Sequence, residues 1–154
     1  MDEVIDLNLK KSFIKKQGCF LQLSDKETDE LANLLIEKHF AVGETIVIEG
    51  DPVDNVFLIV QGQADVRTTT IKDHAQNIKS VAILKAGEAI GLNESGFYSL
   101  SGKRTATVVA MTDMVTLQLS VAKFHGFALA YPHVNEVMRK SAEKVTTRSS
   151  QTDL

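Results

Sequence analysis

The hydrophobic and polar positions of this chain follow a helical period near its ends and a strand period in the middle. In residues 7–20, apolar residues recur loosely among lysines, and leucines return at helical spacing after Ser24. Ser24 and Glu27 have the spacing of a capping box, in which the serine accepts at the helix start and the glutamate reaches back. This pattern predicts a helix from about Asp25 to Lys38.

From Phe40 onward, short β-type runs alternate with glycine turns. The predicted strands span 45–48, 56–60, 64–68 and 78–84, with others between 105 and 119 and a polar turn over 72–77. Short strands at regular spacing are typical of a sandwich or a rolled barrel. A helical pattern returns near Val121, breaks at Tyr131-Pro132 and runs to about Val145. Residues 146–154 are polar and without periodicity, which predicts disorder.

Composition narrows the class of protein. The chain has 154 residues, of which 44% are hydrophobic and 24% charged, and this is ordinary for one soluble globular domain. A net charge of −3 gives no overall attraction to nucleic acid. The sequence shows neither a secretory signal nor a membrane-spanning apolar run, and its single cysteine, Cys19, fits a reducing compartment. We expect a cytoplasmic domain without a nucleic-acid partner, and length leaves open whether it belongs to a longer protein.

The segment between Gly87 and Ala110 contains the most informative candidate chemistry. Gly87 and Gly91 form a glycine turn that leads into a short segment able to start a helix, and Arg104 precedes an apolar strand. Backbone N–H groups at a helix start, aimed at the same point as a guanidinium, form an anion pocket. This combination points to a sensor of a small phosphorylated ligand rather than to an enzyme.

The element order and several local sequences resemble the cyclic-nucleotide-binding domain family, which includes catabolite activators and regulatory subunits of protein kinase A. The resemblance covers about Phe13 to Met138 and rests on residues 40–46, 49–51, 57–62, 84–91 and 104–108. It implies a mainly β fold with flanking α-helices: an eight-stranded antiparallel, jelly-roll-like β-roll with an N-terminal helix and two C-terminal helices. The implied organisation is an N-terminal helical segment (1–23), the binding domain (24–148) and a tail (149–154).

The resemblance also implies a ligand and a site. Gly91 would open a short helix of the phosphate-binding cassette and present backbone N–H groups to the cyclic phosphate of cAMP or cGMP. Arg104 would pair with the phosphate charge, and Thr105 would donate a hydroxyl hydrogen bond to the phosphate or the base. The threonine leaves the choice between the two nucleotides open. The other implied ligand-binding positions are Leu92, Asn93 and Ala106.

Leu92 departs from the family pattern. Ligand-binding members usually have a glutamate there, which accepts a hydrogen bond from the ribose 2′-hydroxyl. A charged hydrogen bond contributes about 1.5–3 kcal/mol, or roughly 10- to 150-fold in affinity, so its loss would weaken binding. Either Glu94 makes the ribose contact from a shifted helix, or the pocket is weak or degenerate.

Two functions therefore remain open. The first is a cyclic-nucleotide sensor that relays binding through its C-terminal helices to a partner protein or fused effector. The second is a degenerate roll that serves docking or assembly, with Arg104 paired internally to Glu88 or Glu94. The sequence indicates no catalytic residue, no cofactor and no metal site, since its four histidines are isolated. A C-terminal apolar face could close the pocket, form a homodimer or pack in the core, and it consists of Phe124, Phe127, Val134, Val137 and Met138.

Overall fold

The described part of the N-terminal region folds into three short helical elements. The computed structural model describes residues 5–93, 96–97 and 102–140. In it, α1 spans Leu7–Lys15, the 3₁₀ helix η1 spans Gly18–Phe20 and α2 spans Asp25–Leu34. The predicted capping box is confirmed: Ser24 Oγ accepts from the Glu27 N–H at 3.1 Å, and Glu27 Oε1 accepts from the Ser24 N–H at 2.7 Å.

The helix predicted from Asp25 to Lys38 ends before its predicted boundary. After α2, the chain forms β1 (Ile36–Phe40), which pairs along its whole length with β10 (Met114–Ser120) in antiparallel register. The Thr116 hydroxyl also donates to the Lys38 carbonyl at 2.8 Å. The prediction is wrong for these last residues because pairing with a strand far along the chain overrides their local helix propensity.

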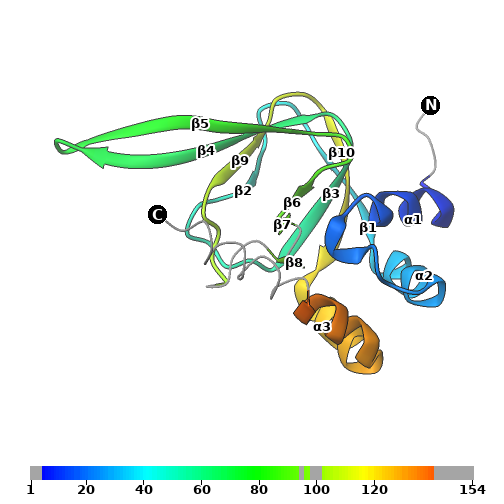
Figure 1. Ribbon diagram of the computed structural model, residues 1–154. Coiled ribbons are helices and arrows are strands. Elements are labelled where there is room, and N and C mark those ends of the chain that lie inside the picture. The colour runs from blue at the N-terminus through cyan, green and yellow to red at the C-terminus, as the bar shows by residue number, and fades with distance from the viewer. Residues whose placement is uncertain (1–4, 94–95, 98–101, 141–154) are drawn as a thin grey trace.

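Two antiparallel four-stranded sheets form a β-roll (Figure 1). One sheet has the strand order β1-β10-β3-β6, the other has the order β2-β9-β4-β5, and β7 and β8 form a separate two-stranded sheet. The eight strands of these two sheets, as the described residues show them, confirm the predicted mainly β roll. The bounds of the remaining strands are β2 Thr45–Val47, β3 Asn55–Gln61, β4 Gln63–Lys72, β5 Ala75–Lys85, β6 Ala89–Ile90, β7 Leu92–Asn93, β8 Gly96–Phe97 and β9 Thr107–Ala110.

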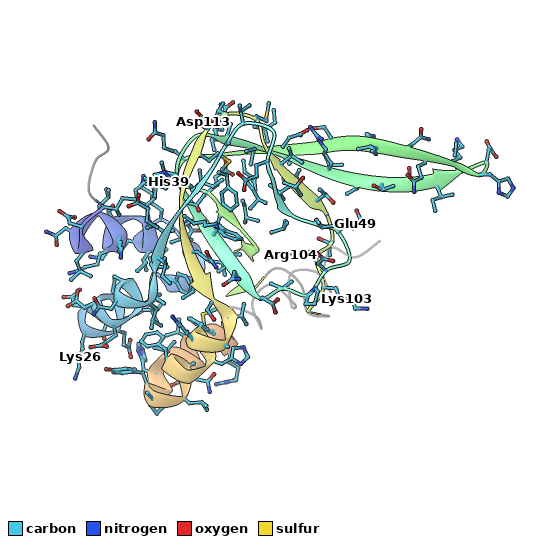
Figure 2. The ribbon with its side chains drawn as sticks, turned by 180° about the vertical axis from the view of Figure 1, so that it is seen from behind. Lys26, His39, Glu49, Lys103, Arg104 and Asp113 are labelled. Carbon is cyan, nitrogen blue, oxygen red and sulfur yellow. The ribbon has the colours of Figure 1, made fainter. Side chains whose placement is uncertain are left out.

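The turn predicted over residues 72–77 is shorter in the structure. Only Asp73 and His74 connect β4 to β5, both with positive φ (54° and 65°), and the two strands pair as far as this connection. The resulting hairpin extends well beyond the rest of the roll (Figures 1 and 2). Residues 71–83 are exposed, so no buried face imposes an apolar alternation that would reveal the strand ends in the sequence.

Buried apolar side chains form two clusters on opposite faces of β3. Val56 and Leu58 point to the helices, whereas Phe57 and Ile59 point into the roll, as successive residues of a strand must. The helical cluster includes Phe13, Ile14, Phe20, Leu31, Leu117, Phe124 and Val134. The cluster inside the roll includes Phe40, Val47, Ala64, Ile90, Val108 and Met114.

The C-terminal helices pack against the N-terminal helices (Figure 1). α3 spans Val121–Ala130, and a second helix begins at Pro132, as predicted, and is described to residue 140. The Phe124 ring lies 5.9 Å from the Phe20 ring, measured between centroids. Of the three predicted roles for the C-terminal apolar face, this conformation shows core packing. The predicted helix end near Val145 and the tail lie outside the described residues.

A buried carboxylate connects the two helical regions. Glu27 Oε1, which already accepts from Ser24, also lies 2.8 Å from His133 Nδ1 in the second C-terminal helix. The Glu27 side chain is almost fully buried, whereas the His133 side chain is half exposed. Burial raises the pKa of the Glu27 carboxyl, but hydrogen bonds from Ser24 and His133 outweigh it and leave that pKa below its usual range. Protonating Glu27 therefore weakens the contact between the helices.

This contact predicts a specific dependence of stability on pH. Because the folded pKa of Glu27 is lowered, its stabilisation is present above the unfolded value of about 4.3 and is lost as the pH falls through the folded pKa. His133→Ala should lower the free energy of unfolding at pH 7 by about 0.5–1.5 kcal/mol and should flatten this acid-side slope. Urea unfolding measured from pH 7 to pH 3 gives both quantities. The exposed control His74→Asn should keep the native slope, and equal slopes for His133→Ala and the native protein would contradict the assignment.

Candidate functional site

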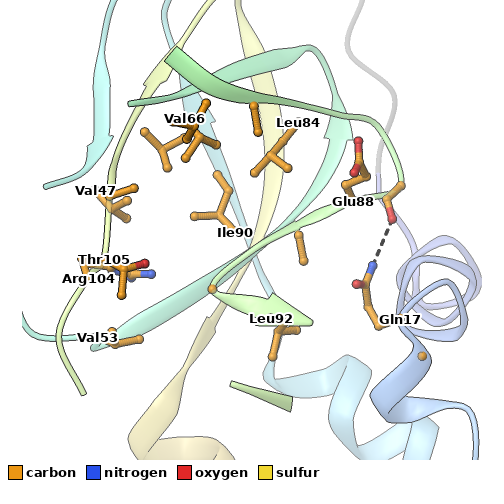
Figure 3. Close-up of a pocket in the computed structure, with 18 of the residues that line it drawn as sticks. Gln17, Val47, Val53, Val66, Leu84, Glu88, Ile90, Leu92, Arg104 and Thr105 are labelled. Atoms are coloured by element: carbon orange, nitrogen blue, oxygen red, sulfur yellow. Dashed lines mark hydrogen bonds between the residues drawn. The ribbon is translucent and has the colours of Figure 1, made fainter. Parts of the chain in front are cut away.

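A cavity of about 1020 Å³ opens between the roll and the N-terminal segment (Figure 3). It lies at the upper end of the range of about 300–1,000 Å³ that is common for small-molecule pockets. Its apolar lining residues are Leu21, Val47, Val53, Val66, Val81, Ala82, Leu84, Ala89, Ile90, Leu92, Ala106 and Val108. Polar side chains reach it from Lys16, Gln17, Thr68, Glu88, Arg104 and Thr105. Among the described residues, the C-terminal helices contribute none of the lining.

Arg104 lies on the cavity wall in the segment before β9 (Figures 2 and 3). Its backbone is fixed on both sides, because its N–H donates to the Asp51 carbonyl at 2.8 Å and its carbonyl accepts from the Gly50 N–H at 2.9 Å. Its Nη2 donates to the Asn55 carbonyl at the start of β3. Only 9% of the residue is exposed. Arg104 therefore lies at the wall of a cavity, and its role in ligand binding stays a prediction.

The electrostatics of Arg104 favour an anionic ligand. Burial lowers the pKa of the guanidinium, and the carboxylates of Asp54 and Asp51 raise it in partial compensation. A guanidinium stays protonated in a protein, so this site holds a permanent positive charge that has lost much of its hydration. A buried charge is costly unless it is paired, and an anion in the cavity would supply that pairing.

The hypothesis of a degenerate roll predicts an internal ion pair between Arg104 and Glu88, and this pair is not formed. The Glu88 carboxylate instead accepts from the Lys85 N–H at 3.0 Å and closes the turn between β5 and β6. The alternative partner, Glu94, lies outside the described residues, as does its predicted contact with ribose.

Gly91 gives the guanidinium room to lie at the cavity wall. Its φ is +96°, a conformation that side chains rarely adopt. A Cβ atom at this position would lie 2.7 Å from Val56 Cγ1 and 3.0 Å from Arg104 Nη1. Glycine is therefore required by the backbone conformation and by the close approach of Val56, and it also leaves room for the Arg104 guanidinium.

The residues after Gly91 form a strand instead of the predicted short helix. Leu92 and Asn93 make up β7, which pairs with Phe97 and Gly96 of β8. Leu92 is 6% exposed and belongs to the cluster beneath the helices. Burial of its apolar side chain there accounts for the strand that replaces the predicted helix start. The array of helix-start N–H groups predicted for the phosphate is therefore absent at these two residues.

Thr105 and Ala106 lie on the cavity wall beside Arg104. Thr105 is exposed and Ala106 is half-buried. Figure 3 shows Thr105 adjacent to Arg104, on the side of the cavity opposite Gln17. A ligand anion at the guanidinium would lie within reach of a hydroxyl donor from the next residue.

The N-terminal wall of the cavity is the part that sequence analysis missed. Lys16, Gln17, Gly18 and Leu21 line it, and Gln17 Nε2 donates to the Gly87 carbonyl at 3.1 Å. No local sequence signal indicates this contact, since the two residues are 70 positions apart. Nearby Cys19 is fully buried, and burial raises the pKa of its thiol to about 12, so it is a packing residue without an activated thiolate.

Two other kinds of site find no support in the part of the chain that the structure describes. No group of three or more His, Cys, Asp or Glu side chains there could hold a metal ion. Among the same residues, no helix is both long and apolar enough to cross a membrane.

The two sheets form a β-roll with a cavity on one side, and sequence comparison identifies the family to which this fold belongs. Residues 37–131 match the cyclic nucleotide-binding domain family, and the chain therefore belongs to that family. It is also similar to the Pycsar effector protein XpPycTIR of Xanthomonas perforans, with 30% identity over 125 residues, which are 76% of this chain and 37% of that protein. The chain thus spans little more than a third of this relative's length.

Solved structures share the fold. The N-terminal domain of a transcriptional regulator from Streptomyces coelicolor A3(2) has a TM-score of 0.76 and 25% identity, covering 92% of this chain and 95% of that one. The regulatory subunit of a cAMP-independent protein kinase A from Trypanosoma brucei has a TM-score of 0.66 and 23% identity, covering 96% of this chain and 48% of that one. The family match confirms the predicted family, and these structural similarities confirm the predicted β-roll.

The packing at Gly91 predicts a loss of stability in Gly91→Ala. The added methyl group combines a strained φ with a clash against Val56 and Arg104, and should lower the free energy of unfolding by about 2–4 kcal/mol. Gly43→Ala is the matched control, because Gly43 has a similar φ of +86° with nothing within 4 Å of the new Cβ. It should lose only about 1–2 kcal/mol. Urea unfolding of the two variants separates the cost of the strained φ from the cost of the steric clash. Equal losses of unfolding free energy would refute the close approach of Val56 and Arg104 to Gly91.

Proposed function

We propose that this chain is a regulatory domain that binds a cyclic nucleotide, cAMP or cGMP, with the phosphate at Arg104. The observation that carries the proposal is a buried, permanently charged guanidinium on the wall of a large apolar cavity. A cyclic nucleotide matches these two features, because its single negative charge would pair with the guanidinium and the rest of the molecule is flat and weakly polar. Membership of a family named for cyclic-nucleotide binding supports the same ligand class.

The residues around Arg104 have separable roles in this proposal. Gly91 leaves space for the guanidinium, and Thr105 donates its hydroxyl to the phosphate or the base. Leu92, Asn93 and Ala106 border the phosphate and sugar, with Leu92 offering no hydrogen bond to the ribose. The valine and leucine side chains of β4 and β5 contact the base. Affinity then depends on one strong charge-assisted interaction plus apolar contact.

The relay that we propose moves the C-terminal helices toward the cavity. In this conformation they lie against the N-terminal helices, and α3 and residues 132–140 leave the cavity uncovered. A ligand that binds better when these helices cover it shifts the population toward a closed state. The closed state would act on a fused effector or a partner protein, in keeping with the greater length of the Xanthomonas relative. We propose a cytoplasmic binding module without catalysis of its own, in which the C-terminal helix also offers a surface for a homodimer contact.

Calorimetric titration with cAMP and with cGMP tests the proposal. We expect saturable binding of at least one nucleotide and a loss of about 30-fold or more in affinity for Arg104→Ala, because the ligand phosphate would lose its buried partner. Arg104→Lys keeps the charge but not the planar fork, and it should retain part of the affinity. Absence of heat with both nucleotides at millimolar concentration would overturn the proposal.

A docking or assembly module is the second candidate function. Its support is Leu92, which is buried in the core and is not available as a polar contact for the ligand. The structural similarity to a regulatory subunit described as cAMP-independent is compatible with this function. It predicts a folded protein whose thermal unfolding is unchanged by either nucleotide, and a nucleotide-dependent rise in Tm would exclude it.

A further inference from the structure

Two buried polar side chains line the cavity among the described residues, and they lie on opposite sides of it. Arg104 is 9% exposed and Gln17 is 8% exposed. The other polar side chains in the lining, from Lys16, Thr68, Glu88 and Thr105, are exposed or half-buried. Figure 3 shows Gln17 across the cavity from Arg104 and Thr105. Buried polar groups need hydrogen-bond partners, so each of these two residues limits what the cavity can hold.

The backbone around Gln17 holds its side chain in place. The residue connects α1 to η1: its N–H donates to the Ile14 carbonyl at 3.0 Å, and its own carbonyl accepts from the Phe20 N–H at 3.0 Å. Its Nε2 donates to the Gly87 carbonyl at 3.1 Å. A carbonyl only accepts, so this contact determines which end of the amide faces Gly87. The amide oxygen is left on the cavity side, as Figure 3 shows.

We propose that Gln17 is a second ligand-recognition residue, whose Oε1 accepts a hydrogen bond from an O–H or N–H group of the ligand at the end opposite its phosphate. This inference rests on the proposed function. In a cyclic nucleotide the groups able to donate are the sugar 2′-hydroxyl and the amino or ring N–H groups of the base. If the Gln17 amide oxygen accepts from one of these groups, it gains a hydrogen-bond partner in a part of the cavity that has few other donors.

The exposed polar residues near Gln17 are less suited to this role. The Glu88 carboxylate already accepts from the Lys85 N–H at 3.0 Å. The Lys16 ammonium lies 4.7 Å from the centre of the Phe13 ring and can only donate. Gln17 is therefore the acceptor that is both buried and positioned by the fold.

Ligand analogues test the proposal by comparing the native protein with Gln17→Leu, a replacement of similar size. Calorimetry would measure cAMP, 2′-deoxy-cAMP and the cyclic phosphate of purine riboside, which lacks the 6-amino group. The native protein should bind one analogue about 3- to 10-fold more weakly than cAMP, and that analogue identifies the donor as sugar or base. Gln17→Leu should lower the affinity for cAMP by a similar factor, and the variant should no longer discriminate against that analogue. Gln22→Leu, at an exposed position of the same segment, should behave as the native protein.

The outcomes separate this inference from the proposed function. If Gln17→Leu lowers the affinity for all three ligands by the same factor, Gln17 only supports the turn at Gly87 and the inference is wrong. The native protein also tests the inference by itself, even if Gln17→Leu fails to fold. Equal affinity for the three ligands would exclude an acceptor specific for the sugar or the base. Binding that is lost in Arg104→Ala but unchanged in Gln17→Leu overturns the inference and leaves the proposed function intact. Absence of binding of both cAMP and cGMP by the native protein overturns both.

Discussion

The burial of the Arg104 guanidinium is the constraint on which the site depends. Taking a charge out of water is costly, so the surrounding backbone has to hold it in a defined place. Residues 50–51 bind its backbone, the Asn55 carbonyl accepts from its side chain, and the absence of a side chain at Gly91 leaves it space. Three separate parts of the chain thus meet at one cation, and the cavity forms beside it.

The N-terminal helices have two structural roles in this architecture. They supply Phe13, Ile14 and Phe20 to the cluster that covers one face of β3, and they supply Gln17 to the wall of the cavity. The C-terminal helices pack on the same N-terminal region through Phe124 and the Glu27–His133 contact. The N-terminal region therefore contacts both the cavity and the C-terminal helices.

Local sequence signals predicted the elements whose stability is local. Ser24 and Glu27 form the expected capping box, Pro132 begins the expected helix, and the apolar run in β3 marks a strand buried on both faces. The family resemblance implied that Arg104 and Thr105 bind the ligand, and both residues line the cavity. The implied roles in ligand binding stay predictions for all the site residues, and so do the domain boundaries at residues 23 and 148. These site residues are Gly91, Leu92, Asn93, Glu94, Arg104, Thr105 and Ala106.

The local pattern by itself indicated a sandwich or rolled barrel with flanking helices, because turn residues, caps and apolar periodicity act over a few neighbouring positions, and the family resemblance specified the roll. Tertiary structure alone decided that residues 36–40 form a strand, since their partners in β10 lie far along the chain. It also decided that Leu92 joins the core instead of a helix start, and that Gln17 reaches the Gly87 carbonyl. These contacts join residues that are distant in the sequence, and their energies exist only once the sheets and helices have packed together.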